Sequence, residues 1–132
     1  MYNIENQKGY FYMRMWKLPP EFLCQKHLLG EHGEIHKHRH NFEKHHKMTG
    51  RIFPVVLIEP ANMQTRHDEL VKEMLARGYN HQSPYIQPDI SYLPENEQNA
   101  RANLEYNLED LMNRCPDCRQ RIEERNFKVN VD

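Results

Sequence analysis

The chain has 132 residues, of which 38% are hydrophobic, and its formal net charge is −1. This length suits one domain with a single core, and the hydrophobic content excludes a wholly disordered chain. The near-zero charge excludes a protein that binds nucleic acid through an overall basic excess.

Cysteine content and hydropathy indicate the cellular compartment. The three cysteines are Cys24, Cys115 and Cys118. An odd number of cysteines without a signal-like segment predicts a reduced, intracellular and cytoplasmic protein. No apolar run approaches the roughly 20 residues that a membrane span needs, so we expect no membrane partner.

The N-terminal third is predicted to contain the first helix. Residues 1–12 lack helical periodicity and are interpreted as an N-terminal extension. Pro19-Pro20 can open a helix, because proline suits the first turn. Apolar and acidic side chains then recur at three- and four-residue steps, which predicts a helix over about residues 20–38. Gly30 and Gly33 weaken this helix by roughly 1 kcal/mol each.

Two further helices are expected downstream. Pro54 argues against a central strand in residues 51–60, which are interpreted as a buried extended or irregular stretch. An apolar stripe that begins at Leu70 predicts a second helix, and Gly78 closes it. Residues 79–95 are interpreted as an ordered loop, and residues 97–114 as a third helix that Pro116 ends. The sequence therefore predicts an all-α, compact single domain of about three helices with long ordered connecting loops.

Seven of the nine histidines lie between His27 and His46. Residues 26–51 also hold six Lys/Arg side chains against three Glu, so the region is basic although the chain is not. A nearby polyanion would raise the pKa of these histidines and add to that charge. Three interpretations stay open at this point: a metal site, a polyanion-binding face, or the active-site helix of an enzyme that acts on nucleic acid.

Specific motifs favour the third interpretation. The stretch HDELVKEMLARGYNHQSPYIQPDISYLP (residues 67–94) resembles the matching segment of the phage endonuclease V-like family, the pyrimidine-dimer DNA glycosylase/AP lyases. Arg14, His27-Leu28 and Glu34 are similar to that family's spacing in its first helix, and Met13-Arg14-Met15-Trp16 is similar to the start of its cellular members. The resemblance covers residues 13–114, which sets apart the extension (1–12) and a C-terminal CxxC turn and tail (115–132).

The resemblance implies a compact all-α fold with the first helix at the DNA face. It implies an amine that attacks the sugar C1′, expels the base and forms an imine, after which β-elimination cuts the strand. An α-amino group suits this step, because its pKa of about 7.7–8.0 leaves more of it neutral than a lysine. That amine corresponds to Met13 in a chain that starts there. Glu34 corresponds to the essential carboxylate.

The same resemblance implies the DNA contacts and the partner. Arg14, Lys26, His27 and Lys37 are the expected DNA-binding residues. The substrate is duplex DNA with a damaged base or an abasic site, of which pyrimidine dimers are the expected lesion, reached by extruding a nucleotide. We expect a monomer that needs no cofactor and no metal, and a phage-encoded origin in a bacterial host is consistent with the resemblance.

The sequence departs from the family pattern at three places. Twelve residues precede Met13, and an internal amide nitrogen cannot form an imine. Gly33 stands where the phage enzyme has an arginine beside the carboxylate. The tail CPDCRQRIEERNFKVNVD replaces the aromatic, lysine-containing tail of the phage enzyme.

Two alternatives therefore stay open. One is a non-catalytic DNA- or protein-binding relative that kept the fold and lost the nucleophile. The other is a metal-dependent protein that uses His32, His36 and His40 at i, i+4 spacing, or the CxxC of Cys115 and Cys118. A lone CxxC is a weak zinc signal, because a closed site needs two more ligands. Cys24 is interpreted as a core residue.

Overall fold

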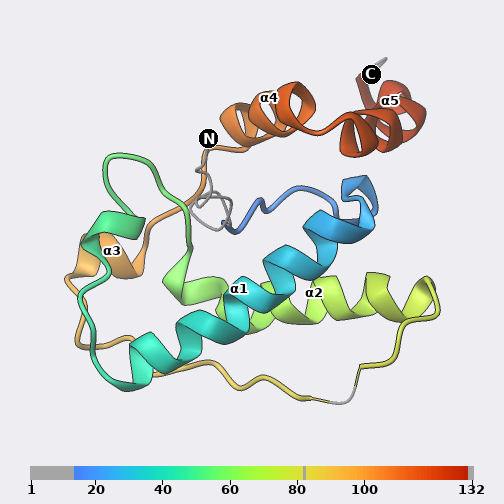
Figure 1. The fold of residues 1–132 in the computed structure, drawn as a ribbon. Coiled ribbons are helices and arrows are strands. Elements are labelled where there is room, and N and C mark those ends of the chain that lie inside the picture. The colour runs from blue at the N-terminus through green and yellow to red at the C-terminus, as the bar shows by residue number, and fades with distance from the viewer. Residues whose placement is uncertain (1–13, 82, 131–132) are drawn as a thin grey trace.

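The all-α fold is confirmed by a computed structural model, which describes residues 14–81 and 83–130 and the side chains as far as Arg125. Within these ranges the chain forms five α-helices and three short 3-10 turns, and no strand (Figure 1). The predicted extension (1–12) and Met13 lie outside the described residues. None of the described helices is both long and apolar enough to span a membrane.

The two central helices cross and pack against each other (Figure 1). Helix α1 spans Gln25–Glu43 and α2 spans Met63–Ala76. Their buried faces carry apolar side chains at helical spacing, which join one core: Leu28, Ile35, Phe42, Met63, Leu70 and Met74. At the contact, Arg66 of α2 donates two hydrogen bonds to the Glu31 carboxylate, at 2.7 and 3.0 Å. A buried, charge-assisted pair of this kind fixes the register of the two helices.

An extended segment before α1 runs through the core. Met15, Trp16 and Leu18 are almost fully buried. The Met15 N–H donates to the Leu57 carbonyl at 2.7 Å, and the Trp16 carbonyl accepts from Asn107 Nδ2 at 3.0 Å. The segment is therefore held between the connection after α1 and the C-terminal helices, with a 3-10 turn at Pro20–Phe22 that leads into α1.

The first helix differs from its predicted limits of 20–38. Pro20 opens only the 3-10 turn, and α1 starts at Gln25 after an extended Cys24. It then continues to Glu43, five residues beyond the prediction, because Phe42 adds another fully buried position to the same face.

The C-terminal region is more segmented than predicted. The single helix expected over residues 97–114 is two helices, α3 (Glu95–Gln98) and α4 (Leu104–Arg114). The chain between them is non-helical because the Ala102 N–H donates to the Glu59 side chain at 2.7 Å, and Asn103 caps α4. Pro116 follows the end of α4 as expected, but it also starts α5 (Pro116–Asn130) in the first-turn position that proline tolerates. Helix α5 packs against the Pro20–Phe22 turn.

Candidate functional site

A cavity of about 480 Å³ lies between the second half of α1 and the residues that follow it. Its lining combines one carboxylate with several basic side chains: Glu34, Lys37, His38, Asn41, His46, Lys47, Met48, Gly50 and Arg51. The 3-10 turn Thr49–Arg51 brings Arg51 back to α1. A concave site with one acid among basic groups suits an anionic substrate.

Glu34 is buried at the wall of this cavity. Its Oε2 atom lies 2.6 Å from Arg51 Nη2 and 3.3 Å from His38 Nδ1. Burial raises the pKa of the Glu34 carboxyl, and the positive charges of Arg51 and Lys37 oppose this shift. Glu34 therefore borders open space and has a raised pKa. Both properties are expected of a general acid or base.

His38 sets the position of the arginine. Its Nδ1 lies 3.0 Å from the Glu34 carbonyl oxygen, and Arg51 Nε donates to its Nε2 at 3.2 Å. This arrangement needs the neutral imidazole with Nδ1 protonated. Burial, above all, lowers the pKa of His38 to about 4, so the ring is neutral at pH 7. Arg51 is therefore held by two residues of α1.

Two backbone hydrogen bonds connect this cavity wall to the N-terminal segment. The Leu57 N–H donates to the Arg51 carbonyl at 2.8 Å, and the Leu57 carbonyl accepts from the Met15 N–H. Met15 is therefore connected, through Leu57, to the turn that carries Arg51. Met13, the expected nucleophile, lies outside the described residues.

The predicted DNA-binding residues do not all share this cavity. Lys37 lines it, one turn from Glu34, whereas Lys26 is exposed at the other end of α1. Arg14 is only 5% exposed: it donates to Asn107 and Asp110, at 3.1 and 2.8 Å, and covers the Trp16 ring. His27 is half-buried beside the Trp16 ring, and its Nδ1 faces sulfur atoms.

Sequence reasoning missed Arg51, His38, His46 and Lys47 as members of the site. The signal that could have found them was the basic excess of residues 26–51, which was treated as a general feature of the region. Only the turn at Thr49–Arg51 shows which of those charges reach Glu34.

Two groups of side chains have the composition of metal sites. Cys24, His27, Cys115 and Cys118 form one, and His32, His36, His67 and His81 form the other. Within each group the potential ligand atoms lie within 4.8 Å of one another. The predicted grouping of His32 and His36 with His40 is not the one that forms, because the His40 ring lies beside His46 instead.

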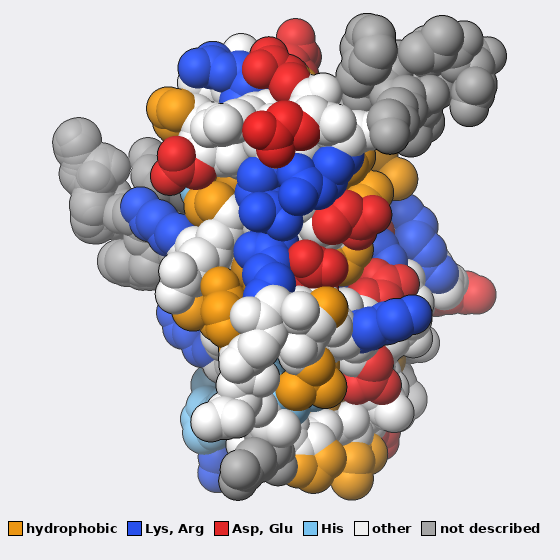
Figure 2. Space-filling model, turned by 90° about the vertical axis from the view of Figure 1, so that its right-hand side faces the viewer, with side chains coloured by type: hydrophobic (Ala, Val, Ile, Leu, Met, Phe, Trp, Pro, Cys, Tyr) orange, Lys and Arg blue, Asp and Glu red, His pale blue; other side chains and the backbone are white. Residues whose placement is uncertain are grey.

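The face on which α2 ends and α5 lies carries mixed charge. Figure 2 shows a column of Lys and Arg side chains there, with acidic side chains next to it. Arg77 and Arg121 of this region both approach Glu73, at 2.7 and 3.9 Å. Such pairing reduces the attraction of a surface for polyanions, whereas Glu34 is the one acidic side chain in the cavity lining given above.

Comparison with known protein families identifies the family of the chain. The model of the family described as pyrimidine dimer DNA glycosylase matches residues 13–87, which is more than half of the chain. No curated protein and no solved structure matches. The matched residues include the buried pre-helix segment, α1 with Glu34, the turn that carries Arg51, and α2. The chain therefore belongs to the pyrimidine dimer DNA glycosylase family.

Proposed function

We propose that the protein is a DNA glycosylase/AP lyase that acts on duplex DNA at pyrimidine dimers or related lesions, with Glu34 as its essential carboxylate. The single observation that carries this proposal is Glu34 itself, a buried acid at the wall of a basic cavity. Its arginine partner is 26% exposed and also lines the cavity, so the pair is open to a ligand.

The nucleophile in this proposal is the α-amine of a chain that starts at Met13. The amine attacks the sugar C1′, the base leaves, and the opened sugar forms an imine with the protein nitrogen. Glu34 stabilises the positive charge that develops at C1′ and moves the proton during β-elimination. The family match begins at residue 13, which supports Met13 as the first residue of the active chain.

The DNA contacts are divided between direct and indirect roles. We assign phosphate contacts to the exposed ammonium groups of Lys37 and Lys26, together with Lys47. Arg14 and His27 are enclosed by other side chains, so we assign them a structural role. They support the segment before α1 and do not contact phosphate.

Borohydride trapping tests the proposal. The full chain and a version that starts at Met13 are incubated with a duplex that contains an abasic site, and the imine is reduced to a stable covalent adduct. We expect the Met13 version to form the adduct and Glu34→Gln to cut the strand at least about 100-fold more slowly. Glu43→Gln is the matched control, because Glu43 is on the same helix but 55% exposed.

The alternative, a non-catalytic relative, predicts a different pattern. Neither version would give an adduct, and Glu34→Gln would leave the protein's behaviour towards abasic DNA unchanged. Retained DNA affinity in that case would identify a binding protein that has kept the family fold.

A further inference from the structure

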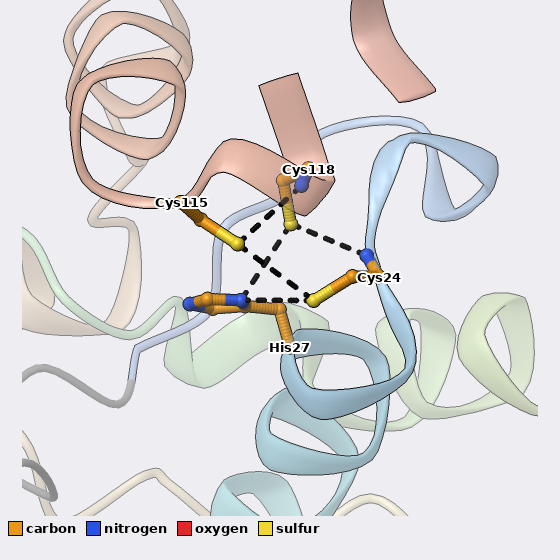
Figure 3. Close-up of side chains that lie close together, drawn as sticks. All are labelled: Cys24, His27, Cys115 and Cys118. Carbon is orange, nitrogen blue, oxygen red and sulfur yellow. Dashed lines mark hydrogen bonds between the residues drawn. The ribbon is translucent and has the colours of Figure 1, made fainter. Parts of the chain in front are cut away.

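Four side chains that are far apart in sequence meet where the pre-helix segment, the first turn of α1 and the α4–α5 junction come together. They are Cys24, His27, Cys115 and Cys118, and Figure 3 shows the three sulfur atoms and the His27 Nδ1 pointing toward one another. They form two short pairs in the sequence, Cys24-x-x-His27 and Cys115-x-x-Cys118, separated by 91 residues. The second pair of ligands that the lone CxxC lacked is therefore present.

The distances fit a tetrahedral zinc ion. Zinc binds sulfur at about 2.3 Å and imidazole nitrogen at about 2.0–2.1 Å, so a tetrahedral site places two sulfurs about 3.8 Å apart and a sulfur and a nitrogen about 3.6 Å apart. Cys24 Sγ lies 3.8 Å from Cys115 Sγ. His27 Nδ1 lies 3.3 Å from Cys24 Sγ and 3.5 Å from Cys118 Sγ.

These distances do not fit a disulfide. A disulfide joins its two sulfurs at about 2.05 Å, and all three cysteines are free thiols in the structure. A redox pair would also leave the third thiol and the imidazole without a role, whereas a metal ion uses all four groups.

The backbone around the cluster is arranged for thiolates. The Cys24 N–H lies 3.2 Å from Cys118 Sγ, and the Cys118 N–H lies 3.4 Å from Cys115 Sγ. Both donors point at sulfur atoms, an arrangement that favours their negatively charged form. A bound cation supplies the missing positive charge and displaces the thiol protons.

We propose that Cys24, His27, Cys115 and Cys118 bind one Zn²⁺ in a closed site. Three thiolates and one imidazole fill all four tetrahedral positions, which is the pattern of a structural rather than a catalytic zinc. The ion joins the start of α5 to the start of α1. This proposal departs from the expectation of a metal-free protein and gives His27 the role of a ligand. It does not depend on the proposed enzymatic activity.

The second cluster supports an independent proposal. His36 Nε2 lies 3.2 Å from His32 Nε2 and 3.1 Å from His67 Nε2, close to the 3.3–3.4 Å expected between nitrogens of a tetrahedral site with bonds of about 2.0–2.1 Å. His81 Nε2 is buried in the same group without a hydrogen-bond partner. His67 Nδ1 lies 3.0 Å from Asp68 Oδ1, the carboxylate contact that orients many metal-binding imidazoles.

We infer that His32, His36, His67 and His81 hold a divalent transition metal, for which Zn²⁺ is the probe. Imidazole ligands suit several such ions, so the ligand set defines the class of metal. The site connects α1, α2 and the loop that follows α2.

Metal analysis of untagged, full-length protein tests both sites. The protein is produced with added zinc, dialysed, and its zinc content per chain is measured by elemental mass spectrometry. We expect two zinc ions in the unmodified chain, the loss of one in Cys118→Ser, and the loss of the other in His36→Gln. Each variant is the matched control for the other, and neither measurement depends on DNA cleavage.

X-ray absorption at the zinc edge keeps the first proposal testable even if Cys118→Ser does not fold. His36→Gln retains only the cysteine cluster, so its zinc should show three sulfur neighbours at about 2.3 Å and one nitrogen at about 2.0–2.1 Å. A His36→Gln protein that is zinc-free, has zinc without sulfur neighbours, or contains a disulfide would overturn the first proposal. Equal zinc content in His36→Gln and the unmodified chain would overturn the second.

Discussion

Glu31 and Glu34 lie on the same face of α1, one turn apart, and each is buried and paired with an arginine. Their surroundings differ. Arg66 is buried along with Glu31 and connects two core helices, whereas Arg51 is partly exposed and shares the wall of the cavity with Glu34. Burial of an acid therefore does not by itself identify a functional site. What distinguishes Glu34 is the adjoining space in which a ligand can reach the buried charge.

The largest effect on stability is expected from Glu31→Gln. This change leaves the buried Arg66 charge without its main partner, so we expect the free energy of unfolding to fall by about 3–5 kcal/mol. Urea denaturation measures it. The control is Glu69→Gln, because Glu69 also contacts Arg66 but is 45% exposed, and its loss should change stability by less than about 1 kcal/mol. Equal effects of the two changes would remove the distinction between a closed and an open ion pair.

Glu34→Gln should show the reverse pattern. We expect at least about a 100-fold loss of strand cutting at abasic sites, which corresponds to about 2.7 kcal/mol in transition-state stabilisation. Stability should change less than in Glu31→Gln, because Arg51 keeps contact with solvent. Single-turnover cleavage and urea denaturation of the same protein separate the two effects. A variant that unfolds as readily as Glu31→Gln would show Glu34 to be another structural pair.

The pH dependence of stability tests the surroundings of Glu34. A carboxyl whose pKa is raised on folding binds its proton more tightly in the folded state, so the folded state loses stability as pH rises through the folded pKa. Burial raises the pKa of Glu34 above its ordinary 4.5. Between pH 4.5 and 7, the unfolding free energy of the unmodified chain should therefore fall relative to that of Glu34→Gln. A change of opposite sign would mean that Arg51 and Lys37 outweigh burial.

The smallest effect on stability is expected from a substitution of Gly33, which precedes Glu34 in the chain. A Cβ added there meets no atom within 4 Å, so Gly33→Ala should raise the free energy of unfolding by about 0.5–1 kcal/mol. Gly78→Ala is the contrasting control, because its φ of +88° is unfavourable for alanine and stability should fall. If Gly33→Ala also slowed cleavage, the carboxylate would depend on a flexible helix rather than on a fixed wall.

The sequence predicted those parts of the site that are set by local spacing. Glu34 and Lys37 are three residues apart on one helix, so their proximity follows from helical geometry. Arg51 could not be assigned in this way, because it reaches Glu34 only after the chain reverses through a 3-10 turn. Its side chain is positioned by Glu34 and His38, 17 and 13 residues earlier in the chain, and such contacts leave no periodic pattern.

The same limit explains what was missed elsewhere. The all-α class followed from helical periodicity and is confirmed. The break between α3 and α4 was not predicted, because it rests on a hydrogen bond between Ala102 and the distant Glu59. Cys24 was correctly placed in the core, but its neighbours Cys115 and Cys118 come from the other end of the chain.

The 91-residue separation of Cys24 and Cys115 has a consequence for the order of folding. During synthesis the N-terminal residues emerge first, so α1 and α2 can pack while Cys115 and Cys118 are still inside the ribosome. Until those residues emerge, Cys24 lacks its contacts with Cys115 and Cys118, and Trp16 lacks its hydrogen bond with Asn107. Closing so long a loop comes late and slowly. The start of the first helix therefore receives its last neighbours only after residues 115–118 have left the ribosome.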